Sequence, residues 1–172
     1  MAGYSYADVE RGLAAALNVD EDTQRGPFRQ RLKHLQRLGL PGVEPGKGTR
    51  IEYTDEQVAK LLIALLMSEV GIDPVAAVAV IQERWASLLG RMVKQATDAE
   101  ATANKNPNPM FFTVRPKLMS KSYPEWIGKF RRYSPRFRQD NAVTMLEFDD
   151  ANWLCARNLT IAMQKLHKAL GS

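Results

Sequence analysis

Long side chains that donate hydrogen bonds recur on one side of the segment 24–38. Apolar residues at helical spacing predict one buried stripe, which leaves the polar side chains facing outward. Arginine and lysine can donate to guanine edges, glutamine can pair with adenine, and each can hold a phosphate. The buried positions are Phe28, Leu32, Leu35 and Leu38, and the outward positions are Gln24, Arg25, Arg29, Gln30, Lys33, Gln36 and Arg37. This chemistry indicates a helix that contacts double-stranded DNA.

The position of each side chain along this helix predicts its contact. In a helix-turn-helix, the second helix enters the major groove with its N-terminal part nearest the bases. The expected base contacts are Arg25, Arg29 and Gln30, and the expected backbone contacts are Lys33, His34 and Arg37. A basic amphipathic helix is also a common solvated surface, so it indicates DNA binding only together with its neighbours.

Two helices separated by a break provide the frame for these side chains. Apolar residues at helical spacing predict a first helix over Tyr6–Leu17. Residues 18–22 interrupt the pattern, and a second helix is expected over about 27–38. Pro27 suits the first turn of this helix, and Gly39 suits its C-terminal end.

A basic hairpin is expected after the second helix. Residues 40–53 are rich in proline and glycine, which predicts turns, and the run 49–53 is typical of an extended strand. The tip of the hairpin is expected at 46–48. We call this hairpin the wing, and we expect Lys47 and Arg50 to hold phosphates or to enter the minor groove.

Two further helices are expected to follow the wing. Thr54 and Gln57 have capping-box spacing, which predicts a third helix that ends near residue 70, before Gly71. Asp73 and Pro74 form an N-cap and first-turn pair, which predicts a fourth helix that runs past residue 93. The expected inner face of the fourth helix comprises Val78, Ile81, Trp85, Leu88 and Met92. This helix is a candidate for dimerisation.

The remaining chain combines a linker with strands and helices. Residues 98–109 are rich in alanine, asparagine and proline, which predicts a linker. Strands are expected over 110–118 and 142–148, with a helix at about 125–133 between them. The last helix is expected to begin after Asp149 or Asp150, and its apolar stripe comprises Leu159, Met163, Leu166 and Leu170.

These elements predict a mainly α fold with small β elements, an α+β arrangement. We expect a winged helix-turn-helix domain over 1–72 and a connecting or dimerisation helix over 73–97. The linker over 98–109 then leads to a small α+β domain over 110–172, whose role is unassigned. At 172 residues the chain is long enough for one sizeable domain or two small ones.

Motifs in the first half resemble the DNA-binding domain of MerR-type regulators. Residues 32–40, LKHLQRLGL, are similar to the end of the family's recognition helix, Leu-Arg-Tyr-Tyr-Glu-x-x-Gly-Leu. Residues 48–54, GTRIEYT, are similar to the family's wing, Gly-Tyr-Arg-x-Tyr-Ser. Gly71 and Ile72 stand where the family has a Gly-hydrophobic-Ser motif after its next helix.

The resemblance spans about residues 4–81 and implies a winged helix that binds DNA. It carries individual DNA contacts over only to Lys33 and Arg50, because other contact positions differ from the family pattern. Nothing after the linker resembles the metal-binding cysteine loop or the drug-sensing domain typical of such regulators. The resemblance therefore implies no metal or drug ligand.

Basic residues gather in two segments. Residues 25–50 hold seven lysines and arginines and one acid, and residues 105–138 hold nine and one acid. In the second segment, cations alternate with aromatic residues. This pattern is typical of a nucleic-acid surface, but also of inward-packed aromatics beside solvated cations. The expected auxiliary contacts to DNA or a partner are Arg131, Arg132, Arg136 and Arg138.

Residues for chemistry other than binding are few. Cys155 is the single cysteine, and with His34 and His167 it does not make a zinc ligand set. No nucleophile and base converge in the sequence, so we expect no enzyme, metal or cofactor. The apolar run 61–67, which no other run exceeds, is far shorter than the roughly 20 residues of a membrane helix. We expect no membrane partner and a cytoplasmic location.

These observations favour a sequence-specific transcriptional regulator that binds double-stranded DNA as a homodimer, with a protein partner or small ligand at the C-terminal domain. An architectural or excisionase-like factor that bends DNA in recombination or plasmid maintenance is an alternative, because it would use the same winged helix. A protein-interaction module without DNA binding is a more distant alternative.

Overall fold

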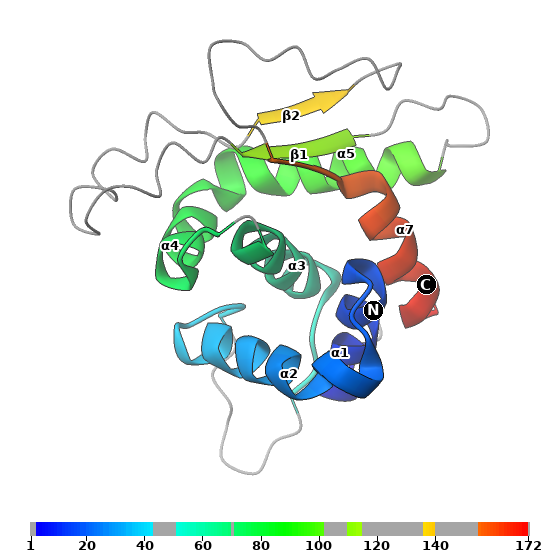
Figure 1. Cartoon of the computed structure of the whole chain (residues 1–172). Helices are drawn as coiled ribbons and strands as arrows, with labels where there is room; N and C mark the ends of the chain where they lie inside the picture. The colour runs from blue at the N-terminus through cyan, green and yellow to red at the C-terminus, as the bar shows by residue number, and fades with distance from the viewer. Residues whose placement is uncertain are drawn as a thin grey trace.

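The computed structural model describes residues 3–42, 51–69, 71–101, 110–114, 136–139 and 155–171 (Figure 1). Over these residues the fold is mainly helical. The helices are α1 (Tyr6–Leu17), α2 (Glu21–Arg37), α3 (Asp55–Glu69), α4 (Pro74–Arg84), the π-helix η1 (Trp85–Leu89), α5 (Gly90–Ala101) and α7 (Leu159–Leu170). The strands are β1 (Met110–Val114), β2 (Arg136–Gln139) and β3 (Cys155–Asn158). Within the described residues, no helix is long and apolar enough to span a membrane.

Helix α3 lies among the other helices (Figure 1). Every residue from Leu61 to Met67 is buried, so this helix is covered on all sides rather than along one stripe. The predicted capping box begins it. The Thr54 N–H donates to Gln57 Oε1 at 2.9 Å, and the Gln57 N–H donates to Thr54 Oγ1 at 3.3 Å. The apolar run 61–67 therefore marks the central helix of the core.

Helix α1 begins at a capping box and packs closely against α7. The Asp8 N–H donates to Ser5 Oγ at 3.3 Å, while the Ser5 N–H donates to the Asp8 carboxylate at 3.2 Å. A Cβ added at Gly12 would lie 3.0 Å from Leu166 Cδ1 and 3.1 Å from Leu170. Glycine therefore permits this close approach, although it weakens the helix itself.

The buried residues form one cluster that extends from α1 to α7. Leu159 and Met163 of α7 belong to the same cluster as Val9 and Leu13 of α1. The last helix thus packs on the first, and the expected domain over 110–172 stays a prediction because much of that range lies outside the described residues. Apolar periodicity predicts which face a helix buries, but it does not say which element covers that face.

Helix α2 begins earlier than the sequence predicted. It starts at Glu21, and Pro27 lies inside it rather than in its first turn. Residues 18–20 are then the whole connection to α1. An internal proline loses one backbone hydrogen bond and crowds the preceding turn, which is why local propensity favours a start at Pro27. Burial of Phe28 and Leu32 in the core outweighs that preference.

The C-terminal end of α2 agrees with the prediction. Gly39 has a φ of 88°, in the left-handed region that favours glycine. The Leu40 N–H donates to the Leu35 carbonyl and the Gly39 N–H to the Gln36 carbonyl, both at 3.0 Å. These two bonds form a Schellman motif that ends the helix. Most of the predicted wing, residues 43–50, lies outside the described residues.

The predicted fourth helix consists of α4, η1 and α5 in succession. At the centre, the Gly90 N–H donates to the Trp85 carbonyl, which is the i to i+5 spacing of a π-helix. A π turn holds more residues than an α turn, so it rotates the buried face of the chain that follows. After η1 the core positions are Leu89, Val93 and Ala96.

This rotation corrects the expected inner face of the fourth helix. Val78 and Ile81, which precede the π turn, are buried as predicted. Trp85 keeps the α-helical register of Ile81 and is half-buried against the core, as expected of the inner face. Leu88 and Met92 are half-buried, and the core positions are Leu89 and Val93 instead. The prediction assumed an uninterrupted α-helical period, and the π turn breaks that period.

Three short strands form an antiparallel sheet in the order β2-β1-β3, which lies along α5 (Figure 1). Strand β1 falls inside the predicted strand 110–118, and β2 was not predicted. Strand β3 corrects the start of the last helix: Cys155 is on a strand, and the helix begins at Leu159. Pairing with β1, a partner distant in the sequence, makes this segment extended. The helix expected at 125–133 and the strand at 142–148 lie outside the described residues.

Candidate nucleic-acid interface

Helices α1 and α2 meet across a short turn of residues 18–20. Asn18 adopts a left-handed conformation with φ of 55°, which ends α1. The Val19 N–H donates back to the Ala14 carbonyl at 2.9 Å, and its side chain packs against the core. A turn of about three or four residues between two helices is typical of helix-turn-helix motifs. The observed turn has this length because α2 begins at Glu21.

A buried carboxylate holds α2 against α1. The Glu10 side chain is 7% exposed, and Arg29 Nε lies 2.7 Å from each of its two oxygens. Arg25 Nε lies 3.3 Å from Glu10 Oε1. A carboxylate out of water requires such partners, because an unpaired buried charge is costly. The two arginines that were predicted to reach bases therefore join the two helices.

Tyr6 lies beside this ion-pair cluster on α1. Its hydroxyl is buried and has no hydrogen-bond partner among the described residues. Burial, followed by the negative charges of Glu10 and Tyr53, raises the pKa of Tyr6. The phenol therefore stays neutral beside the Glu10 carboxylate at ordinary pH.

Four predicted contact residues form an exposed stripe on α2, which we call the α2 stripe: Gln30, Lys33, His34 and Arg37. Their spacing of three and four positions places them on one face of the helix. The Arg37 Nε donates to the Lys33 carbonyl at 3.3 Å. Within the described part of the chain, no acid forms an ion pair with any of the four. The stripe is thus a row of long donors whose cations are not neutralised by nearby carboxylates.

The C-terminal part of α2 is tied to the residue that ends the predicted wing. The Gln36 Nε2 donates to the Tyr53 hydroxyl at 2.7 Å. The backbone of Tyr53 pairs with that of Tyr4 through two hydrogen bonds of 2.9 Å. The Tyr4 hydroxyl donates to Asp55 Oδ1 at 2.9 Å. The chain that returns from residues 43–50 is therefore fixed both to α2 and to the N-terminus.

For the other predicted contact residues, the structure describes either the backbone alone or nothing. Outside the described residues lie Lys47, Arg50, Arg131 and Arg132. Arg136 and Arg138 lie on β2, where their backbones pair with Thr113 and Phe111 of β1. The wing and the second basic segment therefore stay predictions, whereas the α2 residues come together on one helix.

Glu10 is the residue that the sequence analysis missed. It stands between Val9 and Leu13 on the buried side of α1, where an unpaired acid is rare. That misplaced charge is a signal in the sequence. Its principal partner, Arg29, is 19 positions away, and no local pattern names it.

Comparison of the chain with protein-family models, curated proteins and solved structures gives no match. Among the residues that the structure describes, no three histidine, cysteine or acidic side chains gather closely enough to hold a metal ion.

Proposed function

We propose that the chain binds double-stranded DNA as a sequence-specific transcriptional regulator, with α2 as its recognition helix. The observation that carries this proposal is the α2 stripe, whose long donors are exposed and free of acidic partners in the described structure. Glutamine in such a stripe can pair with adenine, and arginine or lysine with guanine or phosphate. A winged helix-turn-helix over residues 1–72 is the domain that this proposal assigns.

The middle of α2, rather than its first turn, is the part that docks in this proposal. Near the start of the helix, the Arg25 guanidinium is already paired with Glu10. Gln30 then becomes the first candidate for a base contact. The candidates for phosphate contacts are Lys33, His34 and Arg37.

Arg25 and Arg29 take a different role in the proposal. Both guanidinium groups pair with Glu10 of α1, and their side chains are 58% and 47% exposed. A side chain that is already committed to a carboxylate has fewer donors for a base edge. We therefore assign these arginines to fixing the angle of α2 on α1, which decides how the stripe meets the groove.

The proposal includes a homodimer and the wing. One recognition helix covers few base pairs, and helix-turn-helix regulators gain specificity by binding two half-sites. The wing residues Lys47 and Arg50 are assigned to the flanking backbone. The Tyr53 contacts with Gln36 and Tyr4 support this assignment, because they anchor the end of the wing beside α2.

The test begins with selection of binding sites from a randomised duplex library by the full chain. Mobility-shift titrations on the selected duplex then compare the double variant Lys33→Glu/Arg37→Glu with Lys168→Glu. Lys168 is exposed on α7, so its variant is a control for charge reversal outside α2, with half the charge change of the double variant. We expect the double variant to bind about a hundredfold more weakly, as the loss of two charge-assisted hydrogen bonds implies.

Two outcomes would overturn this assignment. One is a selection that enriches no sequence, which favours the protein-interaction module. The other is equal weakening by Lys168→Glu, which indicates that general charge rather than the α2 stripe holds DNA. Footprinting then separates a regulator from an architectural factor, because a regulator protects a short two-part site and an architectural factor spreads or bends DNA sharply.

A further inference from the structure

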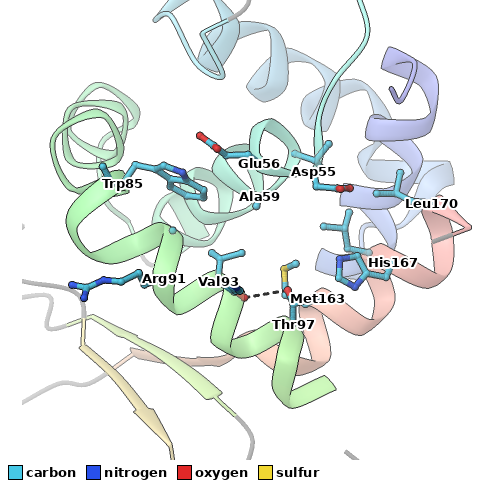
Figure 2. A pocket seen from close by; sticks show the side chains of 15 residues that line it. Asp55, Glu56, Ala59, Trp85, Arg91, Val93, Thr97, Met163, His167 and Leu170 are labelled. Carbon is cyan, nitrogen blue, oxygen red and sulfur yellow. Dashed lines mark hydrogen bonds between the residues drawn. The ribbon is translucent and has the colours of Figure 1, made fainter. Parts of the chain in front are cut away.

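A cavity of about 770 Å³ opens between the start of α3, the η1–α5 segment and α7, on elements other than the α2 stripe (Figure 2). We call it the α3–α5–α7 cavity. Its volume is within the range of about 300–1,000 Å³ that is typical of small-molecule sites.

The wall of the cavity is largely apolar. Figure 2 shows Trp85 at one end, Leu170 at the other, and Val93 and Met163 between them. The aromatic ring and the thioether are polarisable surfaces that adapt to a flat or flexible apolar group. The expected ligand therefore presents most of its surface as hydrocarbon.

The π-helix η1 shapes one end of this wall. Trp85 keeps the α-helical register of Ile81, because its N–H donates to the Ile81 carbonyl, and its half-buried ring packs against the core beside the cavity. A Cβ added at Gly90 would lie 3.2 Å from the Trp85 Nε1, so glycine allows the indole to fold back over the helix. Single π turns inside helices occur frequently at functional sites.

The charged groups around the cavity are not equally satisfied. Glu56 Oε1 lies 2.6 Å from Lys60 Nζ, and Asp55 accepts the Tyr4 hydroxyl. By contrast, Lys94 lines the cavity and has no ion pair in the described part of the chain. Asp55 and Glu56 stay negative but are each engaged by a neighbouring side chain, so Lys94 is a charged group left to bind a ligand, and it is complementary to an anion.

The cation of Lys60 argues against a cationic ligand at the Trp85 ring. Lys60 Nζ lies 5.2 Å from the centre of the Trp85 ring and already supplies a cation to it. Figure 2 shows the Arg91 side chain directed away from the cavity. Lys94 is thus the cation that the geometry assigns to the ligand.

We propose that the α3–α5–α7 cavity binds a small amphipathic monocarboxylate, with its hydrocarbon against Trp85, Val93 and Met163 and its carboxylate at Lys94. This inference does not depend on DNA binding. A charge-assisted hydrogen bond fixes the head of the ligand, and burial of the hydrocarbon supplies most of the affinity.

Calorimetric titration of the full chain with sodium decanoate, below the concentration at which it forms micelles, tests the proposal. We expect saturable binding of one decanoate per chain and weaker binding of decyltrimethylammonium, which has the same tail and the opposite charge. Lys94→Glu should weaken decanoate binding by at least about tenfold, as the loss of one charge-assisted contact implies. Lys168→Glu makes the same charge change on α7 outside the cavity and should alter the affinity by less than about twofold.

A second variant tests the cavity independently of its charge. Thr97 is half-buried and lines the space, so Thr97→Trp should fill part of it and abolish decanoate binding while the melting temperature is retained. The proposal is overturned if decanoate does not bind saturably or if decyltrimethylammonium binds more tightly than decanoate. It is also overturned if Lys94→Glu and Lys168→Glu change the affinity for decanoate equally. Sedimentation equilibrium measures dimerisation in parallel. If decanoate binding weakens as the chain dimerises, the cavity is assigned to a second copy instead.

Discussion

Arg29 Nε lies 2.7 Å from both carboxylate oxygens of Glu10, so the two helices of the candidate DNA interface share one ion pair. The carboxylate is on the buried side of α1, and the guanidinium is on α2, beside the α2 stripe. The buried Glu10 carboxylate has little contact with solvent, so it depends on the Arg29 guanidinium for hydrogen bonds. This dependence restricts where the guanidinium can lie. The angle between α1 and α2 is therefore set by a polar contact as well as by apolar packing.

Replacement of Glu10 by glutamine should destabilise the fold. The loss of a charge-assisted hydrogen bond, discounted because half of the Arg29 side chain is solvated, corresponds to about 1 kcal/mol. Arg29→Ala should lower the urea concentration at the midpoint of unfolding more than Arg25→Ala does, since Arg29 makes the shorter contacts with Glu10. Arg11→Ala, which removes an exposed pair with Asp8, is the control and should change it least. A midpoint that Arg11→Ala lowers as much as Arg29→Ala does would contradict the role of the buried pair.

Salt titrations should separate phosphate contacts from base contacts on α2. Lys33→Ala should reduce the slope of log affinity against log salt by about one unit, because one phosphate contact is lost. Gln30→Ala should leave the slope unchanged and relax the base preference at one position of the selected site. Measurement of both variants on the selected duplex and on a scrambled one checks this. Equal slopes for Lys33→Ala and the unmodified chain would remove Lys33 from the phosphate contacts.

Stability should depend on the ionisation of Asp8. Hydrogen bonds from the Ser5 hydroxyl and backbone, together with Arg11, hold the pKa of Asp8 below its ordinary value of 3.8. The folded state then binds the proton more weakly than the unfolded state, so this contribution is present above pH 3.8 and is lost as pH falls through the lower folded pKa. Urea unfolding of Asp8→Asn and the unmodified chain should therefore differ at pH 7 and converge below pH 3.8.

Ser5→Ala is the matched control for this pH dependence, since it removes the main partner of the carboxylate and leaves the charge. It should bring the pKa of Asp8 closer to its ordinary value, and the pH dependence of stability should then become smaller, because the backbone N–H of residue 5 and Arg11 remain. A difference between Asp8→Asn and the unmodified chain that stays constant from pH 7 to pH 3 would show that the capping carboxylate does not act through its charge.

Deletion of Ser87 should be tolerated. Ser87 is exposed in the π turn, and removing one residue there converts the turn to an α-helical one that keeps Leu89, Val93 and Ala96 facing the core. We expect the melting temperature to fall by less than about 4 °C. Deletion of the exposed Gln95 rotates Ala96 out of the core and should lower it by more than about 10 °C. Equal losses in thermal melts would rule out the π turn as the cause of the rotated face.

Local patterns in the sequence predicted several elements correctly. The bounds of α1, the capping box at Thr54, and the end of α2 at Gly39 are as predicted. Each of these features depends on residues within one helical turn of it, so it can be predicted without knowledge of distant contacts. The exposure of Gln30 and Lys33 was also predictable, because helical spacing opposite an apolar stripe decides it.

The early start of α2 required tertiary information. Pro27 is a local signal for a helix start, and it was misleading because packing of the helix outweighed one lost hydrogen bond. The π turn at Trp85 likewise has no simple signature in the hydrophobic pattern. It is seen only in the folded structure, where Leu89 and Val93 are the buried residues that follow.

By itself, the sequence determined the helices with clear caps and the donors that one helix exposes, because these depend on residues a few positions apart. The tertiary structure decided that Arg29 turns to Glu10 and that α7 covers α1. Such choices depend on the free energy of burying a charge or an apolar face against a particular partner. That partner is distant in the sequence and becomes a neighbour only when the chain has folded.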